Sequence, residues 1–86
     1  MSRFTVAWLE RAQDQLIEVW LQSADRAAVT SAAAIIDNDL SRDAQTKGEE
    51  FIEGFRRLVA PPLEILFSVS VADRIVEVAR VRRLPT

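Results

Sequence analysis

The residues best suited to chemistry in this sequence are arginines in its last third. A guanidinium is a planar fork of N–H donors that binds phosphate and carboxylate oxygens in pairs. Arginines on exposed strands also act simply as solvating charges. We favour phosphate or partner binding, because six arginines fall within the 28 residues 56–83. Apart from Arg74, they are Arg56, Arg57, Arg80, Arg82 and Arg83.

Glu64 is one of three carboxylates that lie in the sequence between these two groups of arginines. A carboxylate in such surroundings could act as a general base. It could also be a solvated residue that pairs across a sheet with Arg80 or Arg82, an interaction that contributes little to stability. We favour this second interpretation. The candidate catalytic residues are therefore Arg56, Arg57, Arg80 and Arg82, with Glu64 as an additional one.

Several catalytic groups are missing from the sequence, which has no cysteine, histidine or tyrosine. This excludes a disulfide framework, a thiolate or imidazole zinc site, a histidine base and a serine–histidine couple. Carboxylates, arginines, hydroxyls and one lysine, Lys47, remain. Lys47 precedes Gly48 at the end of a predicted helix, where a cation complements the helix dipole. We expect neither a cofactor nor a metal.

The length of 86 residues predicts a single domain spanning residues 1–86. A core of this size is thin, and a bound partner could supply the stability that it lacks. The apolar run that ends at Trp8 is too short for a signal peptide or a membrane span. We therefore expect a cytoplasmic protein.

Charge is distributed unevenly along the chain. Residues 1–53 carry five basic and ten acidic side chains, whereas residues 54–86 carry six basic and three acidic ones. A basic last third predicts a surface for phosphate or for an acidic partner. Chance variation between short segments explains the difference equally well.

The polarity pattern predicts one strand, two helices and three further strands. Residues 3–8 are rich in strand formers, and apolar residues of 9–23 recur at helical spacing. Asp25 can cap a second helix, which stops at Gly48 and carries one apolar stripe of Val29, Ala33, Ile36 and Leu40. Alternation then predicts strands over residues 51–59, 63–71 and 75–82, the last two as a β-hairpin.

The element order β-α-α-β-β-β predicts an α+β fold. We expect an antiparallel sheet with an α-helical hairpin packed on one face and the first strand at an edge. The other face is left open for the basic residues of the last strands. The aromatic side chains expected in the core are Trp8, Trp20, Phe51, Phe55 and Phe67.

This order, together with several local patterns, resembles the RelE/ParE toxin superfamily. The first strand runs into Trp8, followed at helical spacing by Ala12, Leu16 and Trp20, as in the family's opening. The second helix carries a similar apolar series of Ala34, Ile35, Ile36 and Leu40. The most specific segment starts with arginines and continues through Pro62-Leu63, an apolar-aromatic strand, a turn and Val76-Glu77-Val78. The resemblance covers essentially the whole chain.

The resemblance implies a bacterial toxin of a type II toxin–antitoxin system, of the plasmid stabilisation type. Such a toxin is bound and silenced by a cognate antitoxin, so a hetero-oligomer is expected and no membrane is involved. RelE-like members are mRNA interferases that cleave mRNA on the ribosome. ParE-like members inhibit DNA gyrase. The fold alone does not choose between these targets.

The residues match the RelE active site only in part. The family places lysines on the strand that carries Arg56 and Arg57 here, and only one of this pair can reach the open face. Glu64 stands where active RelE members have an arginine. Arg80 and Arg82 share one face of the last strand, and the family's terminal tyrosine or histidine has no counterpart.

Three hypotheses therefore stay open. The protein could be a ribosome-dependent endoribonuclease, a gyrase inhibitor without enzymatic activity, or a degenerate member that only binds an antitoxin. The absence of the family's catalytic lysine, histidine and tyrosine favours the gyrase inhibitor and the degenerate member. The basic C-terminal part of the chain favours the endoribonuclease.

Overall fold

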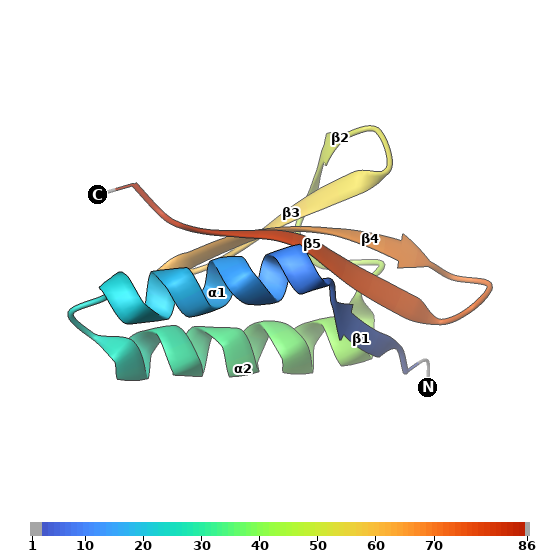
Figure 1. Ribbon diagram of the computed structural model, residues 1–86. Helices are drawn as coiled ribbons and strands as arrows, with labels where there is room; N and C mark the ends of the chain where they lie inside the picture. The colour runs from blue at the N-terminus through green and yellow to red at the C-terminus, as the bar shows by residue number, and fades with distance from the viewer. Residues whose placement is uncertain (1–2, 86) are drawn as a thin grey trace.

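Two helices lie against one face of a five-stranded sheet in residues 3–85, the part of the chain that the computed structural model describes (Figure 1). The predicted α+β class is confirmed, with the helical hairpin on one face. The elements are β1 (Thr5–Trp8), α1 (Glu10–Gln22), α2 (Arg26–Asp43), β2 (Glu49–Ile52), β3 (Phe55–Ala60), β4 (Leu63–Ser70) and β5 (Ile75–Arg83).

The sheet is mixed, with strand order β1-β5-β4-β3-β2. The first strand lies at an edge, as expected, but it runs parallel to β5, with Thr5 opposite Ile75 and Trp8 opposite Val78. The prediction of a wholly antiparallel sheet was therefore wrong. Alternation in a short edge strand is the same in either direction, so only the path of the chain through the helices decides how β1 runs.

The predicted strand over residues 51–59 is in fact a hairpin. Ile52 pairs with Phe55, and Glu53 and Gly54 form the turn between β2 and β3. Gly54 adopts a φ of 83°, a conformation that a residue without a side chain reaches easily. The apolar residues on both sides of the turn concealed it, although a glycine inside a strand pattern is a signal for such a break.

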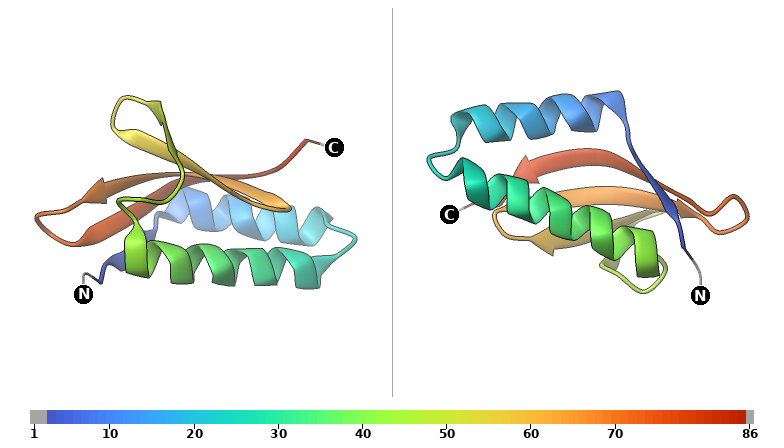
Figure 2. Two further views of the ribbon diagram at one scale, coloured as in Figure 1. Left: turned by 180° about the vertical axis from the view of Figure 1, so that it is seen from behind. Right: turned by 90° about the horizontal axis from the view of Figure 1, so that it is seen from below.

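The core lies between the helices and the inner face of the sheet. α1 packs along β5, while α2 contacts β1, β3 and β4 (Figure 2). Ala32 and Ile36 of α2 are buried in the same apolar cluster as Phe67 of the central strand β4. Burial of these apolar side chains is the main stabilising contribution to the fold. The other buried apolar residues are Phe4, Ala12, Val29, Leu40, Ala44, Leu63, Ile65, Val76, Val78 and Val81.

The helix termini follow local signals in the sequence. The Asp25 carboxylate accepts a hydrogen bond of 3.0 Å from the Ala28 amide, which confirms the predicted cap of α2. α2 ends at Asp43, and a turn carries the chain on to Gly48, whose φ is 68°. No described helix is long and apolar enough to cross a membrane.

The aromatic side chains divide between the core and the surface. Phe67 is fully buried, and Trp8 packs against the core while its Nε1–H donates to Asp37 at 3.1 Å. The core assignment was wrong for the other three. Trp20 is 37% exposed beneath the Arg26 guanidinium, and Phe51 is 54% exposed.

Phe55 is half-buried and lies outside the core. Phe51 and Phe55 lie outside the core for the same reason. The β2–β3 hairpin rises on the side of the sheet away from the helices, so these aromatic rings have no helical layer to pack against (Figure 1).

Candidate functional site

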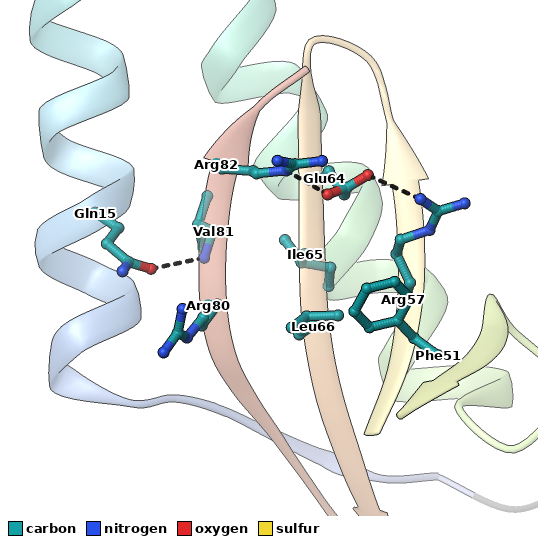
Figure 3. A pocket seen from close by; sticks show the side chains of 9 residues that line it. All are labelled: Gln15, Phe51, Arg57, Glu64, Ile65, Leu66, Arg80, Val81 and Arg82. Atoms are coloured by element: carbon teal, nitrogen blue, oxygen red, sulfur yellow. Dashed lines mark hydrogen bonds and ion pairs between the residues drawn. The ribbon is translucent and has the colours of Figure 1, made fainter. Parts of the chain in front are cut away.

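A pocket of about 290 Å³ opens on the face of the sheet away from the helices (Figure 3). Strand alternation places Arg57, Glu64 and Arg82 on this face, on three adjacent strands. Arg80 and Arg82 both line the pocket from β5, and α1 contributes Gln15 at its edge. The other lining residues are Phe51, Ile65, Leu66 and Val81.

Glu64 is the central residue of the pocket. Its Oε1 accepts from Arg82 Nε, and its Oε2 lies 3.3 Å from Arg57 Nη1 (Figure 3). Only 7% of Glu64 is exposed. The expected pairing with Arg82 is present, but the expectation of a solvated residue was wrong. The neighbouring strand β3 brings Arg57 to the second carboxylate oxygen, so arginines from the strands on both sides of β4 contact Glu64.

Glu49 extends these contacts into an ion-pair cluster of Glu49, Arg57, Glu64 and Arg82. Arg57 Nη2 lies 2.8 Å from Glu49 Oε1. Glu49 and Arg57 are direct cross-strand partners, as are Glu64 and Arg82. The cluster therefore links β2, β3, β4 and β5. With two guanidiniums and two carboxylates it carries no net charge.

The other arginines singled out in the sequence lie outside this cluster. Arg56 faces the opposite way from Arg57 and donates from Nε and Nη2 to the carbonyls of Lys47 and Gly48, both at 2.9 Å. It therefore anchors the segment before β2. Arg80 lines the pocket but forms no ion pair with any described residue. Arg83 is exposed and does not line the pocket.

Two contributors to the site were missed in the sequence. Gln15 Oε1 accepts a 2.8 Å hydrogen bond from the Val81 amide between Arg80 and Arg82. Nothing in a helical glutamine signals this role. Glu49 is one of several acidic residues near the turn, and only the hairpin register, which brings it opposite Arg57, would have identified it.

The charged groups among the described lining residues of the pocket are three arginines and one carboxylate. Both oxygens of this carboxylate, Glu64, already accept from guanidiniums. No hydroxyl, lysine or second carboxylate is among the described residues that line the pocket. Within residues 3–85, no group of three acidic side chains is placed to hold a metal ion.

An apolar basin of about 590 Å³ adjoins the pocket on the same face. Phe51, Phe55 and Leu66 line its floor, and Arg11 and Arg80 contribute guanidiniums. Phe51, Leu66 and Arg80 belong to both hollows. This face therefore combines apolar and cationic groups, a composition common in protein-binding surfaces.

The outer surface of the helical hairpin carries a second apolar hollow, the helix groove. It has a volume of about 240 Å³ and is lined almost wholly by apolar atoms of Leu16, Ile17, Trp20, Val29, Thr30 and Ala33. Ile17 is 56% exposed and Trp20 37%. Such an apolar surface on a small protein is typical of a docking site.

Two solved toxin–antitoxin structures match this arrangement over nearly the whole chain. A chain of the RelBE2 toxin–antitoxin complex from Mycobacterium tuberculosis is 17% identical with a TM-score of 0.76, over 98% of this chain and 94% of that chain. The chromosomal ParDE system from Pseudomonas aeruginosa gives 17% identity and a TM-score of 0.74, over 99% of this chain and 100% of that one. The protein has the RelE/ParE fold.

The RelE/ParE fold also occurs inside a larger protein. TrmO from Pseudomonas aeruginosa matches 95% of this chain but only 36% of its own length, with 20% identity and a TM-score of 0.62. No protein-family model matches the sequence, and no curated protein matches it. The structural matches confirm the fold that the resemblance predicted, at an identity where function must be argued from the site.

Proposed function

We propose that this protein is the toxin of a toxin–antitoxin pair and is held inactive by a cognate antitoxin. One observation carries the proposal. The RelBE2 and ParDE chains and this chain cover one another almost completely, at 94% or more in each direction. The match to TrmO, in contrast, covers about a third of that protein. The whole folding unit thus corresponds to a toxin–antitoxin component.

The antitoxin would dock on the helix groove. Ile17, Trp20 and Leu21 are spaced as i, i+3 and i+4 on α1 and are all exposed. An antitoxin segment that orders on binding would cover this stripe with its own apolar side chains. Binding would also supply apolar burial that an 86-residue core lacks.

The geometry favours a toxin that acts by binding its target. RNA cleavage needs a base for the 2′-hydroxyl, an acid for the leaving oxygen and free cations for the phosphorane. Glu64, the only carboxylate among the described lining residues, is bound to two arginines. The target that fits a binding toxin of this fold is DNA gyrase, as the family resemblance implies.

Ribosome-dependent mRNA cleavage is the second candidate. It is favoured by the convergence of Arg57, Arg80 and Arg82 around one pocket. In this alternative the arginines would stabilise the phosphorane, and the ribosome would supply the remaining groups.

Induced expression in bacteria without the antitoxin tests the proposal. Growth, cellular mRNA 5′ ends and DNA breaks are measured in the same culture. Arrest with DNA breaks and without new mRNA ends supports the binding toxin. Codon-phased mRNA ends would establish the second candidate. Absence of arrest would indicate a degenerate protein and would refute the proposed function.

The partner is tested with the product of the neighbouring reading frame, co-purified with this chain. Ile17→Glu places a charge in the helix groove, so co-purification should be lost. Ile35→Glu is the control, because Ile35 is 54% exposed on α2 but does not line the groove. Equal retention of the partner by both variants would place the docking surface elsewhere.

A further inference from the structure

We infer that Glu64 is a built-in counter-ion that fills the anion site between Arg57 and Arg82, so that the pocket excludes phosphodiesters. Glu64 would thereby determine which class of ligand the open face accepts. The inference rests on the geometry of the ion-pair cluster alone. It holds whether or not the protein is a toxin.

The carboxylate occupies the position that an external phosphate would take. Arg82 reaches it from β5 and Arg57 from β3, each donating to a different oxygen. Two guanidiniums that donate from opposite sides to separate oxygens of one anion form a typical arrangement for phosphate binding. Here both donors point at an oxygen pair that belongs to the protein.

The side chain of Glu64 cannot easily leave this position. Glu64 lies on the central strand β4, whose backbone is held by β3 on one side and β5 on the other. Its side chain is only 9% exposed. Displacement by a phosphate would leave a shielded carboxylate without its cations, which is strongly unfavourable.

The charge balance of the pocket also disfavours phosphodiester binding. Nucleic-acid affinity comes largely from cations that neutralise phosphates and release counterions. Glu49 and Glu64 already neutralise Arg57 and Arg82, and Arg80 is the one pocket arginine without an ion pair to a described residue. A pocket in which two of three guanidiniums are already neutralised, beside an apolar basin, suits a protein ligand better than a polyanion.

Glu64→Gln is the substitution that opens the site. The amide keeps the size of the side chain and removes its charge, so the ion-pair cluster gains one net positive charge beside Arg80. Binding of a fluorescently labelled short single-stranded RNA is measured by anisotropy at low salt. The variant should bind roughly tenfold more tightly than the wild-type chain.

Glu77→Gln is the matched control, because it removes the same charge from an exposed residue of β5 that does not line the pocket. It should bind RNA as the wild-type chain does. Adding Arg82→Ala to Glu64→Gln should abolish the gain. Equal affinity for Glu64→Gln and Glu77→Gln, or tight binding by the wild-type chain, overturns the inference.

A second measurement needs no variant and remains decisive if Glu64→Gln fails to fold. The wild-type chain is titrated with inorganic phosphate while the arginine Nε–Hε signals are followed by NMR. The signals of Arg57 and Arg82 should stay in place. A saturable shift of either signal would show that phosphate enters the site despite Glu64. Neither experiment depends on growth arrest, so this inference and the proposed toxin function fail separately.

Discussion

Gln15 Oε1 accepts a 2.8 Å hydrogen bond from the backbone amide of Val81, a residue 66 positions away in the chain. β1 pairs with β5 only as far as Val78. Beyond that point α1 lies along β5, and the Gln15 side chain satisfies an amide that no strand reaches. The helix thereby holds the part of β5 that carries Arg80 and Arg82.

The first prediction concerns this contact. Gln15→Leu removes the acceptor and leaves the partly buried Val81 amide unsatisfied, which should lower the free energy of unfolding by about 1–3 kcal/mol. Gln15→Glu retains an acceptor oxygen and should lower it less. Urea unfolding followed by circular dichroism measures both. Equal losses in the two variants would mean that the hydrogen bond contributes nothing specific.

The second prediction compares two ion pairs of the cluster. In double-mutant cycles, Glu64 and Arg82 should couple by about 1–2 kcal/mol, because the Glu64 carboxylate is largely buried while Arg82 is still hydrated. Glu49 and Arg57 should couple by less than about 1 kcal/mol, since Glu49 is 71% exposed.

Both double-mutant cycles use the free energies of unfolding of the glutamine variants, measured by thermal or urea unfolding. High salt should reduce the coupling of Glu49 with Arg57 more than that of Glu64 with Arg82, because exposed charges are screened more effectively. A stronger coupling for the exposed pair would contradict the burial of Glu64.

The third prediction uses two glycines that both have positive φ. A Cβ at Gly48 would lie 2.3 Å from the Arg57 carbonyl oxygen, so Gly48→Ala should destabilise the fold by more than about 2 kcal/mol. A Cβ at Gly54 meets nothing within 4 Å, so Gly54→Ala should cost only the backbone strain of about 1 kcal/mol. The two melting temperatures decide the matter, and similar values would refute this prediction.

The fourth prediction concerns neighbouring isoleucines on α2. Ile36 is fully buried, so Ile36→Ala should cost about 2–5 kcal/mol through lost transfer energy and the cavity that remains. Ile35 is 54% exposed, and Ile35→Ala should stay within about 0.5 kcal/mol of the wild-type value. Calorimetry compares the two variants. A large loss for Ile35→Ala in the isolated chain would mean that this surface is covered even without a partner.

Much of the fold could be predicted from the residues themselves, because the relevant signals are local. The helical spacing of Val29, Ile36 and Leu40 identified the buried face of α2, and the alternation over 63–71 identified the central strand. Asp25 marked the start of α2 through its own side chain. These patterns depend only on the period of the backbone and on the polarity of neighbouring residues.

The candidate site was only partly accessible in this way. Strand alternation established that Arg56 and Arg57 face opposite sides, but not which of them faces the pocket. The choice depends on the register of β3 against β4, which pairs Arg57 with Leu66 of the pocket and Arg56 with the buried Phe67. The exposure of Phe51 follows from the β2–β3 hairpin, which places this residue at the pocket.

The sequence alone thus determined the helical hairpin, the strands other than the β2–β3 hairpin, the inner face of β4 and the set of charged residues available for a site. The tertiary structure decided the direction of β1, the burial of Glu64 and the ion pairs that join it to Arg57 and Arg82. Secondary structure follows from the periodicity of apolar and polar residues along neighbouring positions of the chain. Which charges meet depends on strand order and register, which are set by contacts between segments far apart in the chain.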